Sequence, residues 1–367
     1  MKLEVKKEKI LSAVTICEKI AGKHVSLPIL SSVVLETKDN SLILKATNLD
    51  IGVEIEVQAK VLTQGSVALS GSVLKSFLSN MSGDGNVVLE QKGNNLNISL
   101  NNSVASIKTN PTDDFPVIPK VIDGKKLKIN TKDFVSGVTS VWYSSSVSSI
   151  KPELSSVYIY GDNEGLVYVA TDSFRLAEKK IKLKKDKEDG LSILIPFKNI
   201  SEIARIFSDV SYDIDIVTTK NQVSFFAPNI HITSRVVDGN FPDYKQIIPK
   251  TFTSSITVLK QDLLQALKLT NTFSDSFNQV VFSLSVANKN MEIKTKNNDI
   301  GEGSETIKGS VVGEDMVITF NHKYVFDCLQ SIETDGVVLS FNGPGKPLVI
   351  SPSHNASFTY LVMPMNR

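Results

Sequence analysis

A threefold internal repeat is the feature that most limits how this chain can fold. Thr47, Thr171 and Thr295 lie 124 residues apart, and each follows an apolar run and precedes a turn rich in Asn or Asp. The chain has 367 residues, a length typical of two or three domains. A regular period is typical of a chain built from consecutive copies of one unit. The sequence therefore predicts three similar domains, at residues 1–125, 126–252 and 253–367.

Each third contains the same kinds of expected elements. Apolar residues recur at helical spacing in two segments of each third, namely residues 8–21 and 70–81, 131–145 and 196–207, and 260–271 and 320–332. Short alternating runs closed by Asn, Asp or Gly lie between them, as in SSVVLETKDNSLILKAT from Ser31, and this pattern is typical of β-hairpins. The combination predicts an α+β fold in which two helices of each domain pack on antiparallel sheet.

Charge and cysteine content say more about the cellular compartment of the protein than about its function. Lys and Arg number 40 against 39 Asp and Glu, and the net charge of +1 neither indicates nor excludes a nucleic-acid partner. Cys17 and Cys328 each fall inside an expected amphipathic helix, where a buried free thiol is favoured over a disulfide. The first residues lack the apolar core of a signal peptide, and no apolar run is long enough to span a bilayer. We therefore expect a cytoplasmic protein that does not enter a membrane.

The side chains offer little for catalysis. Neither a metal nor another cofactor is expected, because the histidines lie in separate segments without metal-ligand spacing: His24, His231, His322 and His354. Asp172 and Ser173 have no neighbouring histidine, which favours an Asx-type turn over a reactive pair. Glycine-bearing segments from Gly83 and Gly301 lack the lysine of a phosphate loop and are interpreted as hairpin turns. The mixed-charge run 182–189 indicates a solvated loop, and a nucleic-acid contact is the alternative.

Four segments carry a resemblance to a known family. LPILSSVVLE from Leu27, VATDSFRLA from Val169, SRVVDGNFPDYKQIIP from Ser234 and YLVMPMNR from Tyr360 resemble the beta sliding clamp of bacterial DNA polymerase III. The similarity extends over the whole chain, with these segments in the family's order. The resemblance implies a non-catalytic, exonuclease-free processivity factor of DNA replication. Its expected form is a head-to-tail homodimer, a six-domain ring with helices around a central hole that holds double-stranded DNA.

The resemblance also implies a groove that binds a short linear motif. Its expected partners are the polymerase III catalytic subunit, the clamp loader and other proteins that carry the clamp-binding motif. Carried over position by position, the groove would consist of Leu154, Thr171, Ser173, Phe174, Arg175, Leu176, Pro242, Gln246, Ile247, Phe277, Asn321, Tyr324, Pro347, Leu361, Val362, Met363, Pro364, Met365, Asn366 and Arg367. Apolar side chains and flexible methionines near a chain end suit a site that accepts several peptides. Leu176, Leu361 and Val362 are equally compatible with a place in the core.

Basic residues on the polar faces of the helices would meet DNA phosphates in such a ring. The expected contacts are His24, Lys75, Lys198, Arg205, Lys268 and Lys323, with Lys9 and Lys19 on the same kind of face. Phosphate contacts carry no sequence information and weaken with salt, which suits a protein that slides. The joint between two chains is expected at the strand around Ala105 and Ile107 and at the third-domain edge near Phe273.

The chain departs from the family pattern at three places in the groove. It has Ser173-Phe174 where the family often has Gly-His, Gln246 where a basic residue is common, and Asn366-Arg367 where Arg-Leu is common. These differences predict a preference for more apolar or less acidic peptides. Two alternatives stay open at this point: an enzyme, which would need a convergent set of titratable groups, and a non-catalytic repeat-built binding protein that does not act on DNA.

Overall fold

The computed structural model describes residues 1–22, 27–183 and 191–365. The chain divides into two compact units, one formed by Met1–Lys132 with Arg205–Val236 and the other by Asp133–Ala204 with Val237–Arg367. The central third of the chain therefore contributes to both units. Hydrogen bonding explains this division, because strands from different thirds of the sequence join into continuous sheets within each unit.

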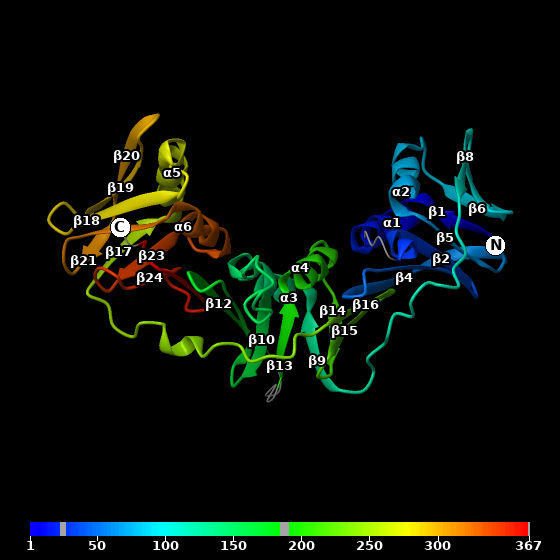
Figure 1. Ribbon diagram of the computed structural model, residues 1–367, viewed down its shortest axis with the longest axis horizontal. Helices are drawn as coiled ribbons and strands as arrows, with labels where there is room; N and C mark the ends of the chain where they lie inside the picture. The colour runs from blue at the N-terminus through cyan, green and yellow to red at the C-terminus, as the bar shows by residue number, and fades with distance from the viewer. Residues whose placement is uncertain (23–26, 184–190, 366–367) are drawn as a thin grey trace. The chain divides into compact units, whose positions relative to one another are not determined.

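The first unit is built on one large antiparallel sheet (Figure 1). Its main path runs in the order β8-β7-β6-β1-β4-β16-β15-β14-β9, and β2, β3 and β5 join it beside β4. The bounds are β1 Lys2–Lys6, β2 Ser32–Lys38, β3 Ser41–Thr47, β4 Ile51–Thr63, β5 Ser66–Ser70, β6 Asn86–Lys92, β7 Asn95–Leu100, β8 Ser103–Lys108, β9 Lys125–Asn130, β14 Asp213–Thr218, β15 Gln222–Ala227 and β16 Ile230–Arg235. The register pairs Ile51 with Ser234 and Ile55 with Ile230, which joins β4 of the first repeat to β16 of the second.

The second unit has two sheets. The larger follows the order β13-β10-β11-β12-β25-β24-β23-β17-β21, and the smaller follows β20-β19-β18-β22. The bounds are β10 Ser156–Asp162, β11 Gly165–Thr171, β12 Arg175–Lys182, β13 Ser192–Pro196, β17 Ser254–Leu259, β18 Gln279–Ser285, β19 Asn290–Asn297, β20 Gly301–Lys308, β21 Ser310–Val312, β22 Met316–Asn321, β23 Gly336–Phe341, β24 Leu348–Pro352 and β25 Phe358–Val362. Here Arg175 pairs with Val362 and Leu176 with Leu361, so the second and third repeats share a sheet.

Helices occur where the apolar spacing predicts them. They are α1 Lys7–Ile20, α2 Gly71–Asn80, α3 Thr131–Thr139, α4 Phe197–Ile206, α5 Lys260–Thr270 and α6 His322–Cys328. Helix α1 packs on α2 and on β3 and β4, and α5 packs on β19 and β20. The α+β prediction, with helices packed on antiparallel sheets, is therefore confirmed. The short 3-10 helices are η1 Pro28–Ser31, η2 Trp142–Ser144, η3 Tyr244–Gln246, η4 Asn271–Phe273 and η5 Leu329–Ser331.

Two of the predicted helices are longer than the structure allows. The segment 131–145 stays α-helical only to Thr139, and η2 follows as a separate turn. The segment 320–332 begins its helix at His322, because the side chain of Asn321 accepts the backbone N–H of Tyr324 and caps the helix there. Helix α3 lies very close to the Tyr168 ring at Gly137. A Cβ at this position would lie 2.5 Å from the ring, so only glycine leaves enough space.

The interpretation of the two glycine segments as hairpin turns is wrong. Residues from Gly301 form the edge strand β20, where Gly303 leaves room for the Phe273 ring that covers it. Residues from Gly83 form a bend that connects α2 to β6, so they join a helix to a strand. Glycine composition suggested a turn in both places, whereas packing of an aromatic ring explains the glycine of β20.

Burial agrees with the expected roles of the cysteines. Cys17 on α1 and Cys328 on α6 are buried free thiols, and burial raises the pKa of both, which keeps them protonated and unreactive. The described part of the chain contains no helix that is both long and apolar enough to cross a membrane.

Candidate protein-docking surface and DNA-facing helices

The predicted Asx turn is present between β11 and β12. The carboxylate Oδ1 of Asp172 accepts the backbone N–H groups of Phe174 and Arg175, at 2.9 and 3.0 Å. Thr171 is buried and donates its hydroxyl to the carbonyl of Arg175 at 2.6 Å. Ser173 adopts a φ of +78°, the left-handed region that short polar residues in turns tolerate best. Asp172 and Ser173 therefore shape a turn, and Phe174 at its tip is 63% exposed.

Arg175 fixes this turn from beneath. Its Nε donates to Asp172 at 2.9 Å and its Nη1 donates to Asp327 on α6 at 2.8 Å. The guanidinium also lies over the Tyr324 ring, 4.3 Å from its centroid. Burial alone would lower the pKa of Arg175, but the groups around it outweigh burial and raise that pKa above its ordinary value. Arg175 is thus a permanently charged, largely buried tie between the turn and α6.

The chain end forms the second side of the surface. Strand β25 pairs with β12 through Leu361 and Val362, and both of these side chains are buried. Beyond the strand, the N–H of Met363 donates to the carbonyl of Phe174 at 2.8 Å, and the N–H of Met365 donates to Thr319 at 2.8 Å. The tail therefore runs beside the turn, and Met363 remains 38% exposed there.

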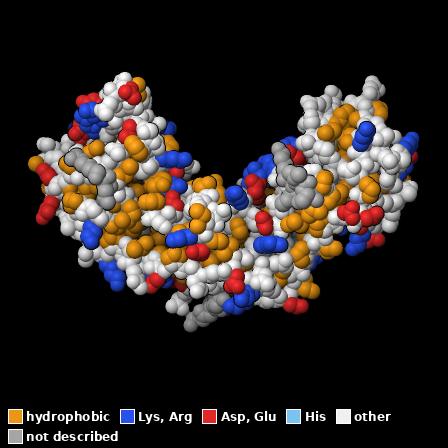
Figure 2. Space-filling model, in the orientation of Figure 1, with side chains coloured by type: hydrophobic (Ala, Val, Ile, Leu, Met, Phe, Trp, Pro, Cys, Tyr) orange, Lys and Arg blue, Asp and Glu red, His pale blue; other side chains and the backbone are white. Residues whose placement is uncertain are grey.

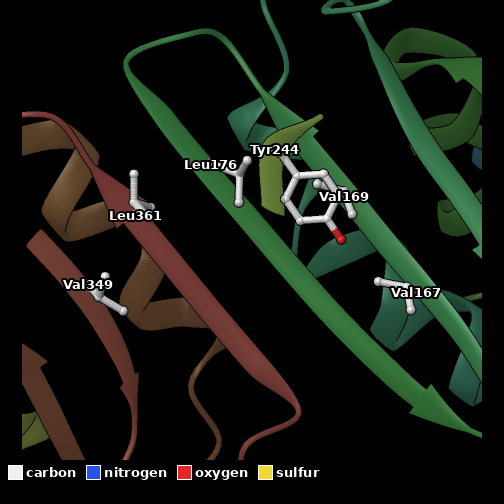
Figure 3. Packing of buried hydrophobic residues seen from close by; sticks show 6 residues of the cluster. All are labelled: Val167, Val169, Leu176, Tyr244, Val349 and Leu361. Carbon is white, nitrogen blue, oxygen red and sulfur yellow. The ribbon is translucent and has the colours of Figure 1, made fainter. Parts of the chain in front are cut away.

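A buried cluster supports both sides. Leu176 and Leu361 pack with Val167, Val169, Val349 and Tyr244 (Figure 3). Tyr244 donates its hydroxyl to Glu178 and shares a 2.8 Å hydrogen bond with Tyr160. Burial and these two partners raise the pKa of Tyr244, so it remains a neutral donor. Leu176, Leu361 and Val362 belong to the core. A ligand would contact the exposed side chains next to them instead.

Three further residues predicted for the groove lie at or near α6 and before β18: Tyr324 on α6, Asn321 at its N-cap and Phe277 before β18. Asn321 caps α6 and donates its side-chain amide to the carbonyl of Phe277 at 3.4 Å. Phe277 is 66% exposed, and Tyr324 lies partly buried beneath Arg175. These contacts connect Phe277 and the turn through one helix.

The other predicted residues have less direct places. Pro242 and Ile247 are exposed next to buried Tyr244, to which both are joined by backbone hydrogen bonds. Gln246 is exposed and donates its amide to Asp243 at 2.6 Å. Leu154 is buried and Pro347 is half-buried just before β24. Met365 and Pro364 are half-buried, whereas Asn366 and Arg367 lie outside the described residues.

Sequence reasoning missed Tyr244, Asp327 and Tyr143. Tyr244 lies within the segment SRVVDGNFPDYKQIIP, but only the structure shows that it is buried and bonded to Glu178. Asp327 meets Arg175 across 152 residues of sequence, and Tyr143 lies 5.9 Å from the same guanidinium. No local pattern in the sequence joins residues so far apart.

The predicted DNA-contacting residues lie on helices of both units, apart from His24, which is outside the described residues. Lys198 and Arg205 are exposed on α4, Lys268 on α5 and Lys323 on α6. Lys75 on α2 is partly neutralised by Glu18, 3.3 Å away. The face shown in Figure 2 carries basic and acidic side chains interspersed, in keeping with the nearly neutral net charge.

The predicted joint residues lie at sheet ends. Ala105 and Ile107 are on β8, the last strand of the large sheet, where Ile107 is buried and Ala105 is half-buried. Phe273 is half-buried and covers Gly303 on β20, which ends the four-stranded sheet. No group of His, Cys, Asp and Glu side chains that could hold a metal ion occurs among the described residues.

Sheets shared between consecutive repeats and exposed apolar side chains beside a fixed turn are typical of a protein that binds partners. Family models for the N-terminal, central and C-terminal domains of the DNA polymerase III beta subunit match residues 1–119, 128–243 and 245–366. The chain therefore belongs to the DNA polymerase III beta subunit family, the sliding clamps. It is a DNA sliding clamp and a non-catalytic processivity factor, as the resemblance implied, and neither alternative function is favoured.

Named relatives and solved structures agree with this assignment. The beta sliding clamp of Staphylococcus epidermidis is 28% identical over 375 residues, which cover 100% of this chain and 99% of the relative. That of Synechococcus elongatus is 25% identical over 371 residues, with the same coverage. The DNA polymerase III beta subunit of Thermotoga maritima superposes with a TM-score of 0.92 at 27% identity, and the sliding clamp of Bacillus subtilis with 0.93 at 25%. Both alignments cover 100% of this chain and 99% of the other.

Proposed function

We propose that this sliding clamp holds its protein partners at one docking surface made of Phe174, Ile247, Phe277 and Met363. Each of these apolar side chains is more than a third exposed. Phe174 lies at the tip of the turn that Arg175 fixes, and Met363 is hydrogen-bonded to it. Phe277 is joined to the cap of α6 through Asn321, and Ile247 follows Tyr244, which packs against Leu176. The hydrogen bond between Met363 and the carbonyl of Phe174 is the observation that carries the proposal, because it brings the chain end beside the turn. As a member of its family, the chain forms a homodimeric ring on duplex DNA and binds the polymerase and the clamp loader.

The chemistry of the docking surface favours a short apolar peptide. Gln246 supplies no positive charge, and its amide is already engaged by Asp243. Two or three buried anchors contribute about 1.5–3 kcal/mol each, and ordering of the peptide offsets much of this gain. A dissociation constant of roughly micromolar size is therefore expected.

We further propose that three domains, with limits near residues 125 and 252, supply the helices that face DNA, and that the protein works in the cytoplasm. Lys198, Arg205, Lys268 and Lys323 are placed on α4, α5 and α6, where ammonium and guanidinium groups can contact phosphates. Reversing the charge of Lys198 and Arg205 should weaken DNA binding equally for all sequences and reduce its salt dependence.

Retention on circular DNA tests the ring function. Clamp loaded onto nicked circular duplex should stay bound at a salt concentration that removes electrostatic binding, because a closed ring is held by topology. Cutting the circle should release it. Equal loss from circular and linear DNA would contradict the proposal.

A further inference from the structure

The turn that carries the docking surface is built a second time in the first unit. Thr47 donates its hydroxyl to the carbonyl of Ile51 at 2.9 Å, as Thr171 does to Arg175. The side chain of Asn48 accepts the N–H groups of Asp50 and Ile51, as Asp172 does in the second repeat. Leu49 has a φ of +74°, close to the +78° of Ser173.

The strand beside the turn is also repeated. The N–H of Arg235, at the end of β16, donates to the carbonyl of Asp50 at 2.8 Å. Met363 makes the same 2.8 Å bond to Phe174 in the second unit. Arg235 therefore occupies the place of Met363, and Asp50 that of Phe174, within an identical backbone frame.

A cavity of about 250 Å³ opens at this second turn. Its apolar lining includes Leu49, which is 40% exposed, and Val117, which is 92% exposed on the segment between β8 and β9. Ile118 of that segment is buried and packs directly over Gly52, so the floor of the cavity is firm. The volume suits one aliphatic side chain with part of its backbone, and it is below the usual range for pockets that hold small ligands.

The mouth of the cavity carries charged side chains, whereas the docking surface of the second unit is apolar. Arg235 and Asp50 are about two-thirds exposed and lie 3.9 Å apart, a separation at which an exposed ion pair contributes little. The guanidinium of Arg235 is thus free to exchange Asp50 for a carboxylate of a ligand, with which it can form two parallel hydrogen bonds.

We propose that the cavity at Leu49, Val117 and Arg235 is a second, weaker docking site for an extended partner peptide. Its ligand presents one aliphatic side chain to the cavity and an acidic neighbour to Arg235. The inference rests on the proposed function, because it assumes that the repeated frame binds peptide at Thr171–Arg175. With one anchor in place of two or three, the affinity is roughly tenfold to a hundredfold lower than at the docking surface.

Photo-crosslinking to the full-length clamp tests this site. The probe is a polymerase-derived clamp-binding peptide with a benzophenone group at its aliphatic anchor and an acidic residue beside it. Mass spectrometry should find crosslinks in residues 47–52 and 116–119 in addition to the docking surface. The double substitution Ile247→Asp with Phe277→Asp should remove only the crosslinks at the docking surface.

Matched variants separate the site from general effects on folding. Leu49→Asn should lower crosslinking at the cavity at least tenfold, and Asn tolerates the left-handed conformation better than Leu, so the fold is preserved. Ile122→Asn is the control, because Ile122 is 63% exposed on the same segment and does not line the cavity. Arg235→Gln should weaken binding of the acidic peptide several-fold and leave its amide analogue unchanged.

The outcomes distinguish the two proposals. Crosslinks confined to the docking surface, or a cavity signal unchanged by Leu49→Asn, would overturn the second site and leave the docking surface intact. Absence of crosslinks at both places would overturn the docking surface as well.

Discussion

Arg175 offers the sharpest test of how the docking surface is held. Its side chain is 10% exposed, and its two partners, Asp172 and Asp327, are 14% and 19% exposed. Arg175→Ala would leave both carboxylates with little solvent and no counter-charge. Removing one partner of a buried ion pair costs about 3–5 kcal/mol. Loss of the contact with the Tyr324 ring adds roughly 1 kcal/mol.

We expect the variant to lose about 5 kcal/mol of stability, a drop in Tm of roughly 10–20 °C for a unit in the range of about 150–250 residues. Peptide affinity should fall together with stability, because the turn that presents Phe174 loses its tie to α6. Calorimetric unfolding and peptide titration below the melting range measure the two effects separately. Arg175→Lys should be intermediate, since one ammonium cannot reproduce the planar fork that reaches both carboxylates.

A compensating variant provides the control. Arg175→Met combined with Asp327→Asn removes the buried positive charge and one of its partners, so it should recover at least half of the lost stability. A melting temperature of Arg175→Ala within 2 °C of the unmodified protein would refute the reasoning. So would unchanged peptide affinity in a variant that has clearly lost stability.

Three further outcomes are expected. Deleting Met363 to Arg367 removes two backbone hydrogen bonds and one side of the docking surface. Calorimetry should then show no binding of polymerase-derived peptides, while sedimentation should still show the dimer. Unchanged peptide affinity would refute the assignment of the docking surface, and loss of the dimer would show a structural role for the tail. Burial would raise the pKa of Glu54, but the His231 ring and the charges of Lys120 and Lys45 lower it to about 2. The resulting contribution to folding stability, up to about 3 kcal/mol, is present above pH 4.5 and is lost as the pH falls towards 2. In acid titration, the stability of Glu54→Gln should therefore depend less on pH than that of the unmodified protein. Gly303→Ala places a Cβ 2.5 Å from the Phe273 ring and should weaken the dimer about tenfold or more in sedimentation, whereas Gly239→Ala, whose new Cβ meets only ordinary contacts, should leave it unchanged.

Local signals in the sequence were sufficient for the turn but not for its support. Thr171, Asp172 and Arg175 lie within five residues, and the side chains of Thr and Asp bond their own backbone, so the Asx turn follows from chemistry that is local. The ion pair of Arg175 with Asp327 depends on how α6 packs, which no short pattern encodes. The same limit applies to Tyr244, whose bond to Glu178 joins a connecting segment to β12.

Composition misled where packing decides. The segment from Gly301 has the glycine content of a turn, yet it continues as β20 because the Phe273 ring takes the space of a side chain at Gly303. Leu176 and Leu361 were compatible with both the groove and the core, and only their packing in the folded protein shows that they are buried. Alternation identifies a strand, but it does not say which face will meet a partner.

The repeat also explains why a second chain completes the sheets. The strand that follows the turn pairs with the last strand of the next repeat in two cases, β4 with β16 and β12 with β25. The corresponding strand of the third repeat is β20, which among the described residues pairs only with β19. The strand of the first repeat that corresponds to β16 and β25 is β8, which in the same residues pairs only with β7. If the same pairing holds for all three repeats, each chain keeps one sheet edge at β20 and one at β8 for a second chain. This predicts head-to-tail pairing of β20 with β8 of another copy. An exposed edge strand favours such pairing, and two chains satisfy both edges only when the assembly closes.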